Sequence, residues 1–236
     1  PGDVYKRRDL DTSLHKALER NEWVFYYQPK LDVRTHRMVG VEALMRWNHP
    51  RRGFVSPDLF ITMAEETGQI RALTEWAVRQ SIADQKTLAE AGHAVTMSVN
   101  ISGRLRSDES FAAFALHEVE MSGADLCLEI TETAVIDNPE IALGIIERFS
   151  AAGVAVSIDD YGSGLSSLSY LKMLNADELK IDRSLVVDAL DSQRDRLILK
   201  STVDLAHGLG MSVVAEGVET EELTTCLTLL GCDVIQ

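Results

Sequence analysis

Short apolar segments alternate with helical patterns along most of this chain, and this alternation limits the folds that are open to it. Short apolar strands separated by helices predict a parallel sheet that is covered on both faces. After a first pair, the predicted strands lie at 95–101, 126–133, 154–158, 178–181, 212–218 and 233–236. The predicted helices lie at 57–66, 70–91, 108–121, 139–152, 165–174, 192–209 and 220–230.

About eight strands in this order favour a closed arrangement. Eight strand–helix units close naturally into a (β/α)8 barrel, and barrels of this kind often fill about 200–250 residues as one domain. The chain has 236 residues, so we expect a single domain over 1–236. An open doubly wound sheet is the alternative, but no GxGxxG motif follows a predicted strand to support a dinucleotide fold.

The first two predicted strands differ from the others in how they are connected. An aromatic and apolar run covers 23–28 and is expected to end at Pro29, and a second run covers 39–47. The residues between them, 32–38, are polar and predict a hairpin-like connection without a helix. Leu10, Leu14 and Leu18 predict an amphipathic helix over 9–20 ahead of this pair.

Net charge and cysteine usage exclude several classes of function. The formal net charge is −14, so a polymer of nucleic acid is not an expected partner, although a small anion could bind where metals and a few basic residues converge. Cys127, Cys226 and Cys232 form no CxxC pair and indicate reduced thiols and a cytoplasmic location. No apolar run reaches the ~18 residues of a membrane span, so we expect no direct membrane insertion in this segment. The chain begins at Pro1 and ends inside an apolar run at Gln236, which indicates a domain of a longer protein, and that protein could be attached to a membrane through other regions.

The predicted strand at 154–158 ends in two adjacent carboxylates. Its sequence continues as Asp159 and Asp160, followed closely by Gly162 and Gly164. Two neighbouring carboxylates repel each other, so keeping both ionised requires a nearby cation. The alternative is a surface β-turn, in which Asp and Gly are common. A site is favoured because the same pattern recurs along the chain.

Acidic, amide and basic residues stand at the ends of the other predicted strands as well. In a parallel barrel these ends meet at one rim, where barrel enzymes carry their chemistry. Each residue alone could be a turn residue or a solvated charge, but chance is a poor explanation for the whole set. The residues at the strand ends are Glu42, Leu44, Arg46, Asn100, Glu129, Glu132, Lys180, Asp182, Glu216 and Gln236.

A ligand set of this composition predicts a particular kind of metal site. Oxygen ligands without Cys or His suit hard cations such as Mg²⁺ or Mn²⁺. An aspartate that bridges beside a second aspartate fits two cations roughly 3.5–4 Å apart, and such pairs stabilise an in-line displacement at phosphorus.

Seven motifs in order resemble those of the EAL-domain family of cyclic di-GMP phosphodiesterases. Glu42-Ala43-Leu44 is the signature tripeptide, within VEALMRW. The other motifs are SVNIS around Asn100, EITE at 129–132, DDYGSG at 159–164, LKID at 179–182, AEGVET at 215–220 and GCDVIQ at 231–236. The resemblance implies a modified TIM-like (β/α)8 barrel with one antiparallel strand, in agreement with the hairpin-like connection. Lys30 is a departure, because the family usually has an apolar residue at this position. The family also continues beyond Gln236, so we expect the C-terminal end of the barrel to be incomplete.

The resemblance also implies a role for each matching residue. Glu42, Asn100, Glu129 and Asp159 match the ligands of one divalent cation, and Asp159, Asp160 and Glu216 match those of a second. Lys180, Glu216 and Glu42 are the implied catalytic residues. Glu132 with Gly162 and Gly164 matches a glutamate and the loop that it braces. The implied substrate-binding residues are Gln28, Leu44, Arg46, Asp182 and Gln236.

Two functions are compatible with these motifs. The first is metal-dependent hydrolysis of cyclic di-GMP to linear pGpG. The second is a weak or inactive EAL domain that binds cyclic di-GMP as a sensor or serves as an interaction module. Every implied metal ligand is present, which favours the enzyme. The family further implies a homodimer and fusion to an upstream sensory or diguanylate cyclase domain.

Overall fold

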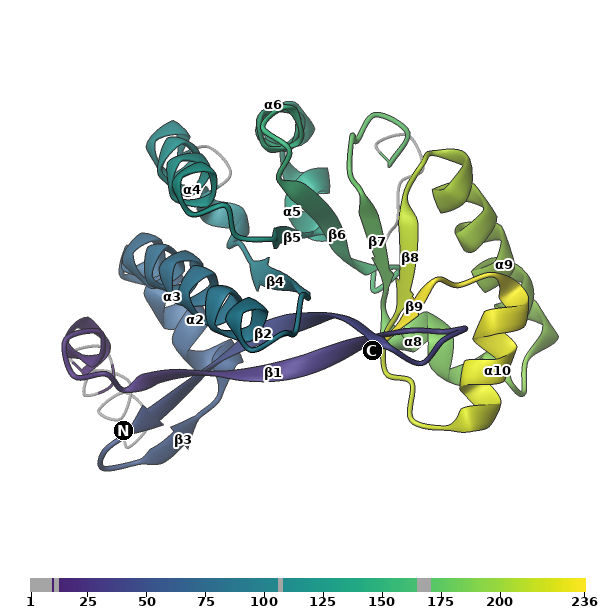
Figure 1. Cartoon of the computed structure of the whole chain (residues 1–236), viewed down its shortest axis with the longest axis horizontal. Helices are drawn as coiled ribbons and strands as arrows, with labels where there is room; N and C mark the ends of the chain where they lie inside the picture. The colour runs from purple at the N-terminus through teal and green to yellow at the C-terminus, as the bar shows by residue number, and fades with distance from the viewer. Residues whose placement is uncertain (1–9, 11–12, 106–107, 165–170) are drawn as a thin grey trace.

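Eight strands close into a barrel in the computed structural model, which describes residues 10, 13–105, 108–164 and 171–236. The strand order is β1-β9-β8-β7-β6-β5-β4-β2, and β1 pairs with β2 to close the ring, while the short β3 pairs with β2 outside it (Figure 1). The predicted α/β barrel is therefore confirmed. The strands are β1 Trp23–Asp32, β2 Met38–His49, β3 Gly53–Val55, β4 Thr96–Asn100, β5 Leu126–Thr131, β6 Ala155–Tyr161, β7 Glu178–Ile181, β8 Ser212–Ala215 and β9 Val234–Ile235.

Strand β1 is antiparallel to both of its neighbours in the barrel, β2 and β9. The predicted hairpin between β1 and β2 is confirmed, and the two strands pair from Trp23 opposite Trp47 to Leu31 opposite Met38. The prediction that Pro29 ends the first strand is wrong, because β1 runs on to Asp32. Proline lacks a donor for a ladder, but β9 pairs with β1 only from Leu31 onward, so one edge of β1 carries no strand at Pro29.

The helices lie on the outside of the strands (Figure 1). Residues 13–17 form part of the expected first helix, whereas most of the helix expected at 165–174 falls on residues outside the described ranges. The helices are α2 Pro57–Glu66, α3 Ile70–Glu90, α4 Glu109–Ser122, α5 Glu132–Asp137, α6 Pro139–Ala151, α8 Arg183–Val186, α9 Gln193–Gly208 and α10 Glu221–Leu230, with short 3₁₀ turns η1 Gly103–Leu105 and η2 Val187–Ala189.

Two predicted strands end at least two residues earlier in the structure than the sequence indicates. Strand β5 ends at Thr131, because the Thr131 hydroxyl caps α5 by accepting from the Ala134 N–H at 3.4 Å, and Glu132 therefore begins a helix. Strand β8 ends at Ala215, so Glu216 lies just past it. In addition, the segment between β2 and α2 contains the short strand β3.

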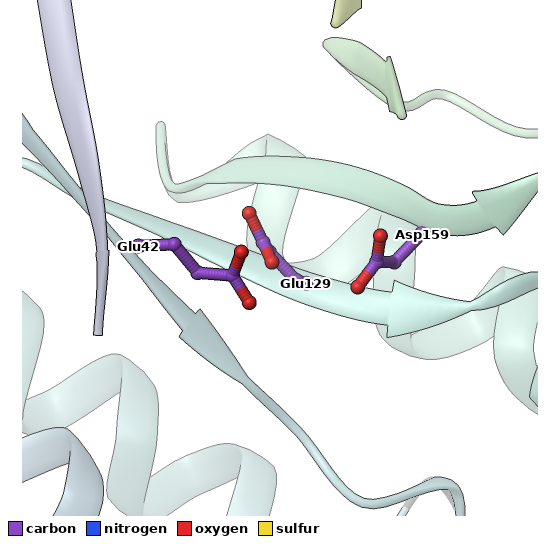
Figure 2. A group of neighbouring side chains, drawn as sticks. All are labelled: Glu42, Glu129 and Asp159. Carbon is purple, nitrogen blue, oxygen red and sulfur yellow. The ribbon is translucent and has the colours of Figure 1, made fainter. Parts of the chain in front are cut away.

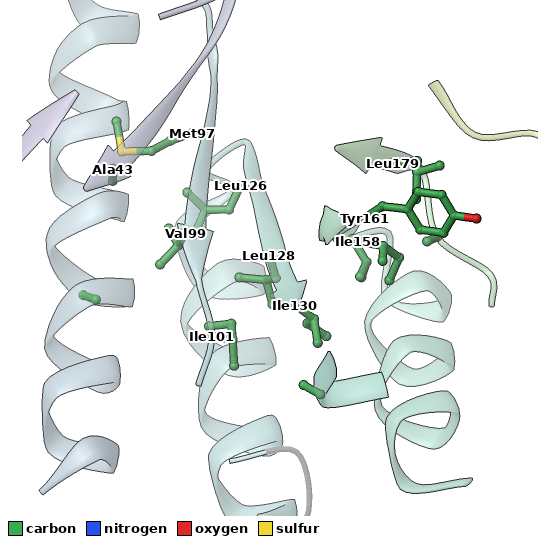
Figure 3. Close-up of a cluster of buried hydrophobic side chains, with 14 of the residues drawn as sticks. Ala43, Met97, Val99, Ile101, Leu126, Leu128, Ile130, Ile158, Tyr161 and Leu179 are labelled. Atoms are coloured by element: carbon green, nitrogen blue, oxygen red, sulfur yellow. The ribbon is translucent and has the colours of Figure 1, made fainter. Parts of the chain in front are cut away.

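The apolar core lies between the barrel and its outer helices. Side chains alternate along a strand, so Leu126, Leu128 and Ile130 of β5 point outward into this core (Figure 3). Cys127 and Glu129 lie on the opposite face of β5 and point into the barrel. Buried polar side chains therefore occupy much of the barrel interior, including Lys30, Glu42, Ser98, Glu129, Ser157, Asp159 and Lys180.

Among the described residues, no helix has the length and apolar character to cross a bilayer.

Candidate active site

Carboxylates from four strands gather at the mouth of the barrel. One group consists of Glu42, Glu129 and Asp159, and a second consists of Asp159, Asp160 and Glu216. Within each group, one oxygen from every carboxylate lies within 4.8 Å of the others. The carboxylates of Glu42, Glu129 and Asp159 converge from three strands (Figure 2). Asp159 belongs to both groups, which places it between them.

The strand register explains why residues far apart in sequence meet here. Ser98 pairs with Glu42, Asn100 with Glu129, and Thr131 with Asp159, so successive strands present their polar ends at similar heights. The Asn100 amide donates to Glu42 Oε1 at 2.6 Å. This bond fixes the orientation of the Glu42 carboxylate and leaves the amide oxygen of Asn100 available as a ligand.

The backbone at Asp160 lets two consecutive aspartates serve one site. Consecutive residues of a regular strand point to opposite faces, so Asp159 and Asp160 would normally separate. Asp160 has φ +57°, in the left-handed region that Asp tolerates better than most residues, and the β6–β7 register shifts between Ile158 and Tyr161. This local irregularity brings both carboxylates to the mouth.

Lys180 lies at the centre of the acidic cluster and is fully buried. Its Nζ is 2.9–3.1 Å from oxygens of Glu42, Glu129, Asp159 and Glu216. Burial disfavours the charged form, but these carboxylates, Glu129 foremost, outweigh it and raise the pKa of Lys180 above its usual value. Lys180 is therefore an ammonium ion throughout the physiological range of pH.

The carboxylates of the cluster differ in acidity because their surroundings differ. Burial raises the pKa of Glu129 to about 7, although Lys180 opposes the shift. Burial also raises the pKa of Asp160 and of Glu216. At Glu42, burial is outweighed by Lys180 and by hydrogen bonds from Gln236 and Asn100, and the pKa falls below its usual value. In the absence of a cation, Glu129, Asp160 and Glu216 therefore bind a proton more readily than Glu42 does.

The predicted substrate-binding residues surround the cluster in different ways. Gln28 of β1 lies opposite Glu42 of β2 in the register and is exposed. Leu44 and Arg46 line a cavity of about 310 Å³ together with Asn100. The Arg46 guanidinium lies 5.5 Å from the centre of the Tyr26 ring and donates to the Met45 carbonyl at 2.9 Å.

Gln236 and Asp182 make contacts of their own with the protein. The Gln236 amide nitrogen donates to Glu42 Oε2, and its buried Oε1 has no hydrogen-bond partner among the described residues. Asp182 caps helix α8, with Oδ1 accepting from the Ser184 N–H at 2.9 Å. One of its carboxylate oxygens therefore stabilises the start of α8.

The three residues predicted to brace the loop after β6 are not equivalent. Glu132 Oε2 accepts from the backbone N–H of Gly162 at 3.0 Å. Gly162 has φ +92°, and a Cβ there would lie 2.1 Å from Leu185 Cδ1. Gly164 has neither constraint, since its φ lies outside the left-handed region and no atom of the described residues lies within 4 Å of its added Cβ.

Lys30 lies in the barrel interior. In the sequence it is notable only as a departure from the family pattern, which predicts no function for it. It is only 3% exposed, and its Nζ contacts Ser98, Glu129 and Glu178. The alternation of β1, which places residues 26, 28 and 30 on one face, could have indicated that it points inward.

The fold and the mouth define a (β/α)8 barrel protein with an acidic site at its C-terminal rim. The family described as "EAL domain" matches residues 11–236, and the chain belongs to that family. The chain is similar to the bifunctional diguanylate cyclase/cyclic di-GMP phosphodiesterase MucR of Pseudomonas aeruginosa, at 40% identity over 229 residues, which cover 94% of this chain and 33% of MucR.

Further comparisons agree with this assignment. The cyclic di-GMP phosphodiesterase PdeR of Escherichia coli is 36% identical over 231 residues, which cover 97% of this chain and 35% of PdeR. The solved structure of the PaMucR phosphodiesterase in complex with c-di-GMP superimposes with a TM-score of 0.89 at 38% identity, covering 97% of this chain and 94% of that one. The chain thus spans about a third of the length of these curated relatives.

Proposed function

We propose that this domain hydrolyses cyclic di-GMP to linear pGpG with the help of two divalent cations, Mg²⁺ or Mn²⁺. The observation that carries the proposal is the position of Asp159, which belongs to both carboxylate groups at the mouth. Relatives that match almost the whole chain are named cyclic di-GMP phosphodiesterases, and the proposal extends their activity to this chain.

The charges inside the barrel support binding of cations. Within the described part of the chain, the ammonium groups of Lys30 and Lys180 lie among more carboxyl groups than they can neutralise, those of Glu42, Glu129, Asp159, Asp160, Glu178 and Glu216. Bound divalent cations would neutralise the remaining negative charge. Oxygen donors of this kind suit Mg²⁺ and Mn²⁺. Glu42, Asn100, Glu129 and Asp159 would hold one cation, and Asp159, Asp160 and Glu216 the other.

The residues around the cluster would bind and orient the substrate. Arg46 would hold a phosphate, because a guanidinium matches phosphate oxygens with two parallel hydrogen bonds. Leu44 would present an apolar surface beside it. Gln28, Asp182 and Gln236 would contact the rest of the ligand with their polar groups.

The proposed reaction adds water to one phosphodiester. The water oxygen forms a bond to phosphorus, and the bond from phosphorus to one ribose oxygen breaks. That oxygen takes up a proton, which balances the proton that the water loses, and ends as a hydroxyl of pGpG. Two divalent cations, when bound, would lower the pKa of water and neutralise charge on the phosphoryl oxygens. Glu216 is the candidate that accepts a proton from the water, while Lys180 keeps its proton at Nζ and directs a positive charge at the reacting phosphate.

The test is a turnover assay with purified protein. We expect linear pGpG to accumulate from cyclic di-GMP in the presence of Mg²⁺ or Mn²⁺, and to stop accumulating when EDTA is added. Chromatography separates the two nucleotides. Tight binding of cyclic di-GMP without turnover, under either cation, would instead support a sensor or interaction module and would refute the proposed hydrolysis.

Three further expectations concern the protein around this domain. We propose that the domain forms a homodimer, that an upstream sensory or diguanylate cyclase domain is fused to it, and that it works in the bacterial cytoplasm. Light scattering of the purified domain tests the first expectation, since a mass near one chain would contradict it.

A further inference from the structure

Lys30 is a buried ammonium whose hydrogen bonds all go to other residues of the barrel interior. It belongs to β1 and lies in the register opposite Gly40, one layer nearer the N-terminal end of the barrel than the Gln28–Glu42 pair. A Cβ on Gly40 would lie 3.7 Å from Lys30 Cδ and 3.0 Å from the Thr96 carbonyl oxygen. The distance to Lys30 is an ordinary van der Waals contact, so the missing side chain at Gly40 avoids a close approach to the Thr96 carbonyl of β4 rather than to Lys30.

The Lys30 ammonium has three acceptors, each at 2.8 Å: Ser98 Oγ, Glu129 Oε1 and Glu178 Oε1. An ammonium group has three N–H donors, so this set uses all of them. Its position is therefore determined from three strands at once, and it has no donor left for a ligand at the mouth.

The two oxygens of Glu129 are divided between two lysines. Oε1 accepts from Lys30, whereas Oε2 accepts from Lys180 at 3.0 Å on the side of the mouth. Lys30 therefore sets the rotation of the carboxylate, so that Oε2 is the oxygen directed toward the other acids. A carboxylate that ligates a metal is commonly oriented by a hydrogen bond of this kind to its other oxygen.

If Lys30 only stabilised the fold, an ion pair with Glu178 alone would be enough to neutralise its buried charge. Glu178 lies at the edge of a cavity of about 240 Å³ near the N-terminal end of the barrel, where its side chain is 17% exposed. Burying a lysine rarely stabilises a protein more than an apolar residue of similar size would. The contact that this interpretation leaves unexplained is the one to Glu129, a residue whose side chain is fully buried.

We propose that Lys30 is a positioning residue that orients Glu129 for binding a divalent cation. The inference rests on the proposed function, since it assumes that Glu129 is a metal ligand. Lys30 itself touches neither substrate nor cation. Lys30 also pairs with Glu178, so its positive charge neutralises only part of the negative charge of Glu129.

The experiment measures Mn²⁺ binding to the folded protein by calorimetry, without substrate. Lys30→Met removes the ammonium and keeps an unbranched side chain, and we expect its Mn²⁺ affinity to fall roughly 10- to 100-fold. Lys200→Met is the matched control, because Lys200 is an exposed lysine that pairs with Asp204 on helix α9, and its affinity should equal that of the wild type. Circular dichroism checks that each variant is folded.

Lys30→Met leaves Glu178 without its partner, so the double variant Lys30→Met/Glu178→Gln provides a second comparison if the single variant does not fold. A weakened Mn²⁺ affinity in the folded variant supports the positioning role. An unchanged affinity together with a lower melting temperature overturns it and leaves a structural role, while the proposed function stands. If the wild type binds no Mn²⁺, the metal site fails first, and the role of Lys30 fails with it.

Discussion

Glu132 Oε2 accepts a hydrogen bond from the backbone N–H of Gly162 at 3.0 Å, and this bond ties helix α5 to the segment that follows β6. Glu132 is the first residue of α5, and Gly162 follows Asp160 by two positions. Glu132 is therefore not one of the carboxylates grouped at the mouth, but it supports the backbone next to two of them, Asp159 and Asp160.

Replacing Glu132 tests this support. We expect Glu132→Ala to lower turnover roughly 10- to 100-fold, because the backbone next to Asp159 and Asp160 loses an anchor. Glu132→Gln keeps a carbonyl oxygen that can accept from Gly162, so it should retain most of the activity. Steady-state kinetics at saturating Mg²⁺ measures both. Equal losses in the two variants would contradict a role as hydrogen-bond acceptor.

The two loop glycines should respond differently to the same substitution. Gly162→Ala places a methyl group against Leu185 at a residue with φ +92°, and we expect it to lower the free energy of unfolding by roughly 1–3 kcal/mol. Gly164→Ala meets no atom of the described part of the chain within 4 Å and should change that free energy by less than about 0.5 kcal/mol. Urea denaturation of both variants makes the comparison. Similar losses of unfolding free energy in the two variants would show that contact with Leu185 is not the reason for a glycine at position 162.

Glu42 should be indispensable for turnover. Its carboxylate accepts from Asn100, Lys180 and Gln236, so Glu42→Ala removes a proposed ligand together with an acceptor that these three donors share. We expect turnover to fall by at least roughly 100-fold. Glu118→Ala, which removes an acid on the outer helix α4, serves as the control. Unchanged hydrolysis in Glu42→Ala would refute the assignment of the site.

Lys180 should affect the rate more than binding. Its ammonium contacts four carboxylates and is directed at the reacting phosphate in the proposed reaction. We expect Lys180→Ala to lower kcat by roughly 100-fold or more, with a much smaller change in KM. Initial rates over a range of cyclic di-GMP concentrations separate the two constants. A large rise in KM at constant kcat would assign Lys180 to substrate binding instead.

The metal-free protein should lose stability as the pH rises toward neutrality. Burial raises the pKa of Glu129 to about 7, with Lys180, Glu42, Lys30 and Asp159 around it. An acid with a raised pKa binds its proton more tightly in the folded state, so stability falls between about pH 4.5 and pH 7, on the order of 1–3 kcal/mol.

Thermal melts in EDTA across this range measure the effect. Glu129→Gln cannot ionise at this position, so its melting temperature should depend less on pH in the same window. Added Mn²⁺ should stabilise the wild type more at pH 8 than at pH 5.5, because metal ligands must be deprotonated. A slope of the same size in Glu129→Gln would assign the effect to other groups.

The barrel and the convergence of its acids follow from patterns that are visible in the sequence. Alternating strands and helices predict the parallel sheet, and the polar segment 32–38 predicts the hairpin that makes β1 antiparallel. Strand-end acids at Glu42, Glu129 and Asp159 meet because parallel strands share one rim.

Other features depend on contacts that no local pattern encodes. The left-handed backbone of Asp160 accompanies a shift in the β6–β7 register, which is a property of two strands together. The partners of Lys30 lie 68, 99 and 148 residues away in sequence. Likewise, Pro29 could remain within a strand only because β9 begins to pair with β1 two residues later.

The polar interior of this barrel separates the residues of the candidate site from the apolar packing that stabilises the fold. Apolar packing lies outside the ring of strands, where Leu128 and Ile158 meet the helices, whereas the ionisable groups lie inside it. Engineering for heat tolerance can therefore repack the outer shell while the inner one is left untouched.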